Sequence, residues 1–274
     1  MSAVATPRAE ALARFRASYG EHRAAEGRGA GGTAELLALP YLHAGPQAAQ
    51  WRVRSRTYDA FVARVVRPMA RELGRPLRVL DLGAGNGWLS YRMMTLGHEA
   101  AAVDVRDDAV DGLGAAAGYD PHLPKPFERF VASFDALPVR GGSYDVAVFN
   151  ASLHYALDLA ATLREAARAV RPGGRIAILD SPFYRRAADG EAMVAEKRRH
   201  AAERFGERAE ALVSLPFIEY LTRARLTDAS SELRLRWTRH RVRYPLGYET
   251  RPIVAKLRGR RTPSRFDLWE CTVP

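Results

Sequence analysis

The sequence predicts an α/β fold in which helices cover both faces of a doubly wound, mostly parallel sheet of seven strands. Three observations lead to this class. From residue 76 onward, short apolar runs alternate with stretches of helical periodicity. A glycine-rich loop directly follows the first apolar run, at the edge where a parallel sheet binds ligands. Two late runs, 234–244 and 265–273, alternate in the manner of antiparallel edge strands.

Residues 1–75 are predicted to form a helical N-terminal extension. Residues 8–25 have helical periodicity, and a glycine-rich break follows them. From Trp51 to Leu73, apolar residues recur three or four positions apart. This spacing predicts an amphipathic helix with a kink or a break at Pro68.

The segment 50–61 of that helix is a candidate lid over a ligand. Two aromatic and three basic side chains could contact a ligand there: Trp51, Tyr58, Arg52, Arg54 and Arg56. The simpler interpretation is an ordinary helix with one core face and one solvated face.

The predicted sheet core occupies residues 76–274. Strands are expected at 77–83, 99–105, 129–133, 144–152 and 175–181, and helices at 87–97, 106–117 and 156–170. A proline-rich loop is expected at 118–128. After the fifth strand the alternation stops, and residues 182–233 are expected to form a helical cap insert, interrupted near Pro216.

The bulk properties fit a single large α/β domain with an appended cap, because the chain has 274 residues. No apolar run approaches the roughly 18 residues that span a bilayer. The N-terminus lacks the apolar core of a secretory signal, and Cys271 is the single cysteine. We therefore expect a cytoplasmic protein without a membrane span. The oligomeric state is not predicted.

The loop after the first strand has the spacing Asp81-x-Gly83-x-Gly85-x-Gly87. Glycine permits positive φ and close approach to the backbone. A dinucleotide fingerprint would place its third glycine at Trp88, and a P-loop would continue with Gly-Lys-Ser/Thr. Asp81 would also repel a pyrophosphate. The loop therefore favours a ligand with a cationic or hydrogen-donating group.

Asp104 ends the second predicted strand, next to this loop. A carboxylate at that position can accept hydrogen bonds from both hydroxyls of a ribose. It predicts an adenosine-type ligand without distinguishing one such ligand from another.

Five motifs in order resemble those of class I S-adenosylmethionine-dependent methyltransferases. They are VLDLGAGNGWLS, AVDV, FDALPV, SYDVAVFNASLHYA and LREAARAVRPGGRIAILD, and they cover about residues 76–182. They are most similar to the type 11 group, which includes quinone-biosynthesis methyltransferases. The resemblance implies a Rossmann-like methyltransferase fold, S-adenosylmethionine as the cofactor and S-adenosylhomocysteine as a product.

The resemblance also implies roles for the loop residues. Five of them would cradle the methionine part of the cofactor: Asp81, Gly83, Ala84, Gly85 and Gly87. Asp104 would hold the ribose hydroxyls and Val105 would pack on the adenine. Asn150 would line the methionine side.

The segment ASFDALP departs from the family, because Ser133 stands where an aspartate is common. Either Ser133 or Asp135 would then meet the adenine amino group, with the Phe134 backbone nearby. Both alternatives stay open.

His154 is the candidate catalytic residue, at the mouth of the implied substrate site. An imidazole with a pKa near neutral pH could take a proton from a hydroxyl or an amine. It could equally form part of the pocket wall. With His154 as a base, O-methylation of a small-molecule acceptor is slightly favoured over N- or C-methylation. The remaining histidines are scattered, so no metal site is predicted.

The main alternative function is an RNA methyltransferase. Residues 234–265 hold eleven basic residues and one acidic residue, nearly the whole net charge of +11. Such a segment attracts nucleic acid, although a solvated face is the simpler interpretation. NASLHY differs from the Asn/Asp-Pro-Pro-aromatic motif of many RNA base-methylating enzymes, so nucleic acid is the less expected partner. A nicotinamide-dependent oxidoreductase and a scaffold without turnover are further alternatives.

Overall fold

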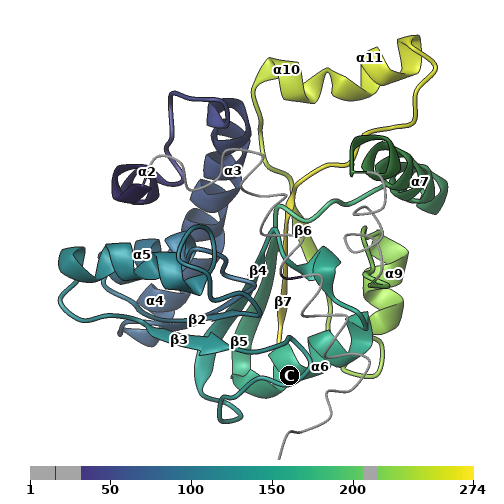
Figure 1. Cartoon of the computed structure of the whole chain (residues 1–274). Coiled ribbons are helices and arrows are strands. Elements are labelled where there is room, and N and C mark those ends of the chain that lie inside the picture. The colour runs from purple at the N-terminus through teal and green to yellow at the C-terminus, as the bar shows by residue number, and fades with distance from the viewer. Residues whose placement is uncertain (1–15, 17–31, 206–214) are drawn as a thin grey trace, which may run out of the picture.

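The structure is a computed structural model that describes Arg16, residues 32–205 and residues 215–274. The predicted helix at 8–25 therefore lies, apart from Arg16, outside the described residues. The described helices and strands are shown in Figure 1.

A seven-stranded sheet forms the centre of the molecule, in the order β3-β2-β1-β4-β5-β7-β6. The strands are β1 Arg78–Leu82, β2 Glu99–Asp104, β3 Glu128–Val131, β4 Tyr144–Asn150, β5 Val170–Leu179, β6 Thr238–His240 and β7 Leu268–Thr272. The first five run parallel, and β7 is antiparallel to both β5 and β6. The predicted fold class and the antiparallel pairing of the two late runs are confirmed.

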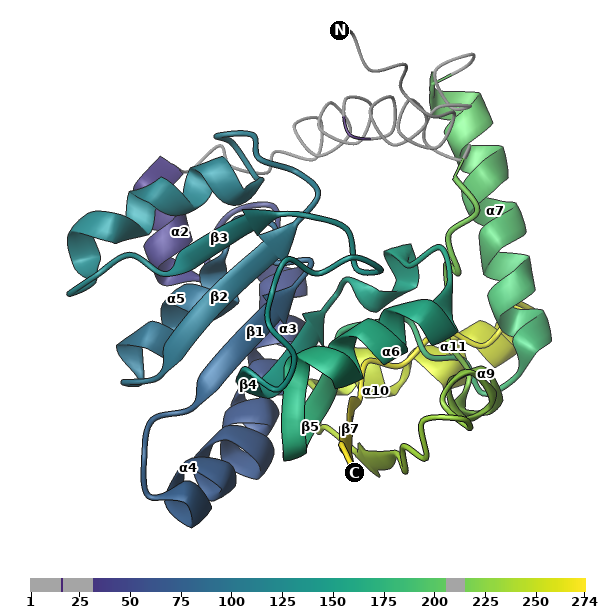
Figure 2. The same ribbon diagram turned by 90° about the horizontal axis from the view of Figure 1, so that it is seen from below.

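Helices cover both faces of this sheet (Figure 2). Val79 and Val146 pack in one core with α3 Ala48–Phe61, α4 Arg67–Leu73 and α5 Trp88–Thr95. The alternate residues Leu80 and Ala147 pack in a second core with α6 Leu159–Ala169 and α9 Arg223–Ala229. The inner strands are buried on both faces, which explains their continuous apolar sequence.

The long predicted helix at 51–73 is continuous but changes geometry before Pro68. A π-helical turn, η1 Val62–Val66, joins α3 to α4, and Pro68 lies in the first turn of α4. Proline has no N–H to donate to the preceding turn, so a wider turn at this point avoids an unsatisfied bond. The change comes where a kink or a break was expected.

The prediction of a helix over 106–117 was wrong. Residues 106–112 form turns, and a 3-10 helix, η2 Leu113–His122, follows and takes in part of the expected loop. Asp108 Oδ1 accepts hydrogen bonds from the N–H groups of Val110, Asp111 and Gly112. A local turn of this kind competes with an α-helix for the same backbone donors.

The fifth strand begins earlier than predicted, at Val170, because RPGG lies within β5 instead of forming a turn before it. The pairing with β4 shifts between Tyr144 and Val146, which marks a bulge there.

Asp158 starts α6 by accepting a hydrogen bond from the Ala161 N–H at 3.0 Å.

Four more helices and one short turn surround the sheet: α2 Gly32–Ala38, α7 Ala187–Phe205, α10 Leu246–Glu249, α11 Arg251–Leu257 and the 3-10 turn η3 Leu153–Tyr155. Helices α7 and α9 fall within the expected insert at 182–233. The helices α10 and α11 lie inside the basic segment and were not predicted. They form an arm that projects beyond the sheet (Figure 1).

Candidate functional site

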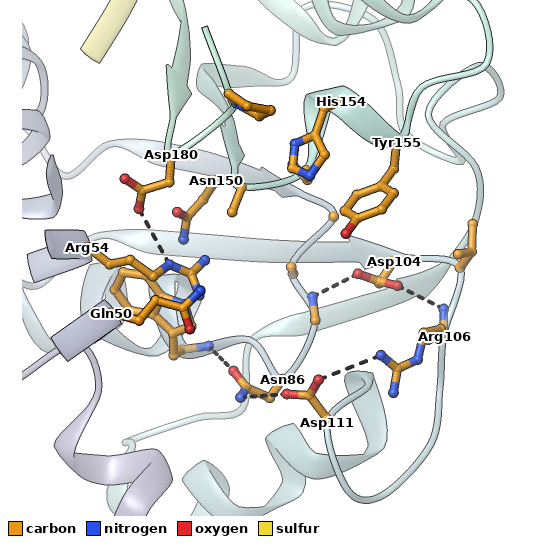
Figure 3. Close-up of a pocket in the computed structure, with 18 of the residues that line it drawn as sticks. Gln50, Arg54, Asn86, Asp104, Arg106, Asp111, Asn150, His154, Tyr155 and Asp180 are labelled. Carbon is orange, nitrogen blue, oxygen red and sulfur yellow. Dashed lines mark hydrogen bonds and ion pairs between the residues drawn. The ribbon is translucent and has the colours of Figure 1, made fainter. Parts of the chain in front are cut away.

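A cavity of about 720 Å³ opens at the carboxyl ends of the parallel strands. The loops after β1, β2, β4 and β5 all contribute to its wall, and α3 closes it from the N-terminal side. Figure 3 shows the polar side chains that face it. This is the position where a wound parallel sheet places its ligand site.

The three loop glycines have positive φ, and each meets different surroundings. A Cβ on Gly83 would stand 2.3 Å from the Ser152 Cβ, and one on Gly87 would stand 2.9 Å from Phe127 Cζ. Gly83 and Gly87 are therefore required by the protein's own packing. On Gly85 a Cβ would come no closer than 3.6 Å to another atom, the Asp111 carbonyl oxygen. Gly83 and Gly85 line the cavity and Gly87 does not.

Asp104 lies beside Gly85 at the end of β2. Its Oδ2 accepts the Gly85 N–H at 2.8 Å, and its Oδ1 accepts the Arg106 N–H at 2.9 Å. Each carboxylate oxygen keeps a further lone pair. Burial raises the pKa of Asp104, and these two N–H donors offset part of that rise. The carboxylate is thus held in a fixed orientation at the cavity wall.

Asp81 does not line the cavity. It lies behind the loop, 1 % exposed, where Ser90 donates a hydrogen bond to its Oδ2 at 3.0 Å. Burial raises the pKa of Asp81 to about 7, although Ser90 lowers it in part. The binding roles expected for Asp81 and Gly87 stay predictions, and the structure gives both residues a part in holding the loop.

The other residues expected to bind the cofactor all line the cavity: Ala84, Val105, Ser133, Phe134, Asp135 and Asn150. Phe134 packs edge-to-face on Phe149 of β4, with ring centroids 5.7 Å apart. Ser133 and Asp135 both reach the cavity wall, so the choice between them stays open.

The ends of β4 and β5 carry two strained residues. Ala151 follows Asn150 with φ 57°, and Asp180 follows β5 with φ 50°. Such backbone is costly for residues other than glycine and is concentrated at functional sites. Asn150 Oδ1 is buried and has no hydrogen-bond partner among the described residues.

His154 lines the cavity from the η3 turn, next to Tyr155, with ring centroids 4.2 Å apart. Burial lowers the pKa of His154 to about 3, and the positive charges of Lys197 and Arg54 lower it further. The expectation of a pKa near neutral pH is therefore wrong, and the ring is neutral at pH 7. Within the part of the chain that the structure describes, its Nδ1 is buried without a hydrogen-bond partner.

The candidate lid residues divide between the cavity and the core. Trp51 and Arg54 line the cavity, and the Arg54 guanidinium carbon lies 4.5 Å from the centroid of the Trp51 ring. Tyr58 is buried against Trp88 and does not line the cavity, and neither do Arg52 and Arg56. Whether the segment moves over a ligand stays a prediction.

Sequence reasoning missed several cavity residues, of which Asp180 is the most distinctive. It is 6 % exposed, and Arg54 Nε lies 3.5 Å from its Oδ2 (Figure 3). Asn86 and Asp111 were missed too: Asn86 Nδ2 donates to Asp111 Oδ1 at 3.5 Å. A polar residue directly after a buried strand was the available signal for Asp180, the same signal that identified Asp104.

The basic segment 234–265 is partly engaged within the protein. Its internal partners include carboxylates and one carbonyl: Arg239 with Asp267, Arg241 with Glu249, Arg251 with the Ser264 carbonyl, Arg261 with Glu196, and Arg265 with Glu249 and Asp267. Eight of the eleven cationic side chains are nevertheless exposed. They include Arg239 and Arg241, and the other six are Arg234, Arg236, Arg243, Lys256, Arg258 and Arg260. The net charge of the segment is therefore larger than the positive charge that it can present to an external partner.

Two features are absent from the residues that the structure describes. Within that part of the chain, no helix is both long enough and apolar enough to cross a membrane. Across the same residues, no group of three or more His, Cys, Asp or Glu side chains could hold a metal ion.

Residues 80–178 match a family model described as a methyltransferase domain. A malonyl-[acyl-carrier protein] O-methyltransferase of Erwinia pyrifoliae is 33% identical over 103 residues, 38% of this chain and 37% of that protein. An arsenite methyltransferase of Aquipseudomonas alcaligenes is 32% identical over 123 residues, 41% of this chain and 35% of that protein. The alignment thus spans well under half the length of these curated relatives.

Among solved structures, a chain of the complex between the Haloferax volcanii Trm112 methyltransferase activator and a methyltransferase has a TM-score of 0.54 at 18% identity. That similarity covers 81% of this chain and 90% of the other. The YcgJ protein of Bacillus subtilis has a TM-score of 0.52 at 14% identity, covering 73% of this chain and 93% of the other. These similarities show a shared fold.

Proposed function

Because residues 80–178 are a class I, S-adenosylmethionine-dependent methyltransferase domain, we propose that this chain transfers a methyl group from S-adenosylmethionine to a small-molecule acceptor. S-adenosylhomocysteine would be released. One observation carries the proposal: the Gly85 N–H and the Asp104 carboxylate are joined at the wall of a large cavity over the strand ends. This pairs a loop that admits a ligand with a carboxylate that can bind a ribose.

The hydrogen-bond acceptors and apolar surfaces that line the cavity fit this cofactor. The Asp104 lone pairs that the Gly85 and Arg106 N–H groups do not use can accept hydrogen bonds from the two hydroxyls of a ribose. Val105 and Phe134 offer apolar surface to an adenine. The unpartnered Asn150 Oδ1 can accept a hydrogen bond from the cofactor's ammonium group. Asp81 would act from behind the loop, by fixing Ser90 and the start of α5.

Methyl transfer is chiefly a problem of positioning. The sulfonium supplies an activated methyl group, so the protein must align the acceptor atom with it and exclude water. Trp51 and Arg54 on α3 close one side of the cavity, and the η3 turn with His154 closes another. This enclosure supports the proposal that the chain holds both reactants away from solvent.

Oxygen is the acceptor atom that we favour. The Erwinia relative is named for O-methylation, although its alignment covers only part of either chain. The argument for O-methylation from a His154 base with a near-neutral pKa is weakened, because burial makes the imidazole a poor proton acceptor. We therefore expect His154 to orient the acceptor through a hydrogen bond.

The test is calorimetry with S-adenosylmethionine and S-adenosylhomocysteine on the wild-type protein and two variants. We expect the wild type to bind both ligands and Asp104→Asn to bind at least tenfold more weakly, because one carboxylate oxygen becomes an NH₂ that cannot accept. Asp107→Asn, which changes an exposed neighbouring carboxylate, should match the wild type. An absence of heat for both ligands with the wild type would refute the proposal.

A further inference from the structure

Asp180 presents a buried carboxylate to the cavity, and among the described residues neither of its oxygens is in a hydrogen bond of normal geometry. Arg54 Nε lies 3.5 Å from its Oδ2, and the side chains of Thr57 and Arg54 stabilise the carboxylate only in part. A buried carboxylate without well-formed hydrogen bonds costs folding free energy, and its positive φ adds to that cost. A ligand that donates to Asp180 would recover part of this cost.

The neighbours of Asp180 in the cavity also lack partners of their own. Among the described residues, His154 Nδ1 on the η3 turn is buried without a hydrogen bond, and so is Asn150 Oδ1 at the end of the adjacent strand β4, the atom proposed above for the cofactor's ammonium group. In Figure 3 the side chains of Asp180, Asn150 and His154 all lie at the upper end of the view. The neutral imidazole can accept at Nδ1 when its proton is on Nε2. This end of the cavity is therefore rich in hydrogen-bond acceptors.

The cations near this end have partners within the protein. Arg54 faces Asp180, and Lys197 donates to both carboxylate oxygens of Glu219, at 2.7 and 3.0 Å. Arg251 donates to the Ser264 carbonyl at 2.8 Å. Because Arg54 already faces Asp180, the negative charge of the Asp180 carboxylate would oppose the binding of an anionic acceptor beside it.

We propose that the β4–β5 end of the cavity is the acceptor subsite, and that Asp180 binds the acceptor there through an O–H or N–H hydrogen. The methyl acceptor is then a hydroxyl compound or an amine and not a carboxylic acid. This inference rests on the proposed methyl transfer. It separates the chain from the Erwinia relative, whose name specifies a malonyl group.

Asp180 also has a place in the reaction. As the lone pair of the acceptor oxygen or nitrogen forms the bond to the methyl carbon, the carbon–sulfur bond breaks and its electron pair stays on sulfur. Asp180 takes the proton that the acceptor loses and passes it to water when the product leaves. Burial raises the pKa of Asp180, and Arg54 and the Thr57 side chain offset part of the rise. In its carboxylate form Asp180 therefore binds a proton more tightly than an ordinary aspartate does.

The test compares three probes of one shape on the protein loaded with S-adenosylhomocysteine: 4-ethylphenol, 4-ethylaniline and 4-ethylbenzoate. Their affinities are measured by ligand-observed NMR. We expect the phenol or the aniline to bind at least tenfold more tightly than the benzoate. Equal binding of the three, including no binding of any, or a preference for the benzoate would overturn the inference.

Asp180→Asn gives the second arm, with Glu232→Gln as a control that removes an exposed carboxylate elsewhere. We expect Asp180→Asn to lose the preference for the phenol or aniline and to bind S-adenosylhomocysteine within threefold of the wild type. A tenfold loss of cofactor affinity would assign the carboxylate to the cofactor and overturn the inference. A wild type that binds no cofactor refutes the proposed function instead, so the two failures are distinguishable.

Discussion

Gly83 and Ser152 are in direct contact across β1 and β4, so closely that a Cβ on Gly83 would stand 2.3 Å from the Ser152 Cβ. Ser152 is 3 % exposed and donates its hydroxyl to the Leu82 carbonyl. The contact joins the glycine-rich loop after β1 to the loop after β4. The Gly83–Ser152 contact therefore fixes the position of one loop of the cavity wall relative to the other, without the help of a ligand.

This contact predicts that Gly83→Ala is strongly destabilising. The added methyl group meets a buried side chain and also requires a residue other than glycine to keep φ at 75°. We expect a loss of about 2–4 kcal/mol in the free energy of unfolding, measured by urea denaturation.

Gly97→Ala is the matched control. Gly97 has φ 82° with open space around it, so alanine should cost only about 1 kcal/mol there. Equal losses for the two variants would show that the Ser152 contact is unimportant and that the backbone conformation alone requires glycine.

Asp145 at the start of β4 predicts an acid-sensitive fold. Burial alone would raise its pKa, but hydrogen bonds from the Arg75 and Arg171 guanidinium groups and the Arg78 N–H outweigh burial. The pKa of Asp145 is thus about 2, below the ordinary 3.8. Because the folded state binds this proton less tightly than the unfolded state, the stabilisation is complete above about pH 5. It is lost as the pH falls toward 2.

The expected size of this effect is about 2 kcal/mol, from a shift of nearly two pKa units. The measurement is urea unfolding of the wild type and Asp145→Asn at pH 7, 4 and 3. The variant should be less stable at pH 7, and the difference should shrink at pH 3. A difference that stays constant with pH would contradict the charge argument.

The strands and the cofactor edge could be predicted from the sequence, because both follow from local patterns. Runs such as 77–83 are apolar on both faces only when buried between helix layers. Asp104 and the loop glycines then follow by position, since strand ends meet at one edge. The error at 106–117 arose because Asp108 bonds to the backbone locally, a contact that helical periodicity does not reveal.

The acceptor side of the cavity could not be predicted in the same way. Asp180 follows β5, Arg54 lies on α3 and Tyr248 on α10, and only the tertiary fold brings these residues to one cavity. The burial that lowers the pKa of His154 depends on the same assembly. A single sequence shows which residues are polar, but it does not show which of them lose their hydration in the fold.

His154 gives a prediction about turnover. Since its ring is neutral at pH 7 and a weak proton acceptor, we expect His154→Gln to lower kcat less than tenfold at saturating cofactor. Any ionisation in the pH–rate profile of the wild type should persist in His154→Gln, because the proposed proton acceptor is Asp180. A loss of a hundredfold or more, together with an ionisation that disappears in the variant, would restore His154 as the base.

The basic segment gives a prediction about nucleic acid. Eight of its eleven cationic side chains are exposed, and two of these, Arg239 and Arg241, pair with Asp267 and Glu249. Single-stranded RNA that contacted the other six would release few counterions. A plot of the logarithm of the RNA-binding constant against the logarithm of the salt concentration should then have a slope no steeper than about −4, because each neutralised phosphate of a single strand contributes roughly −0.7. Filter binding between 50 and 300 mM salt measures this slope, with Lys256→Gln and Arg258→Gln as variants that should reduce it. A slope near −8 with tight binding at physiological salt would require the internally paired arginines to open toward RNA, and it would favour the RNA methyltransferase alternative over a small-molecule acceptor.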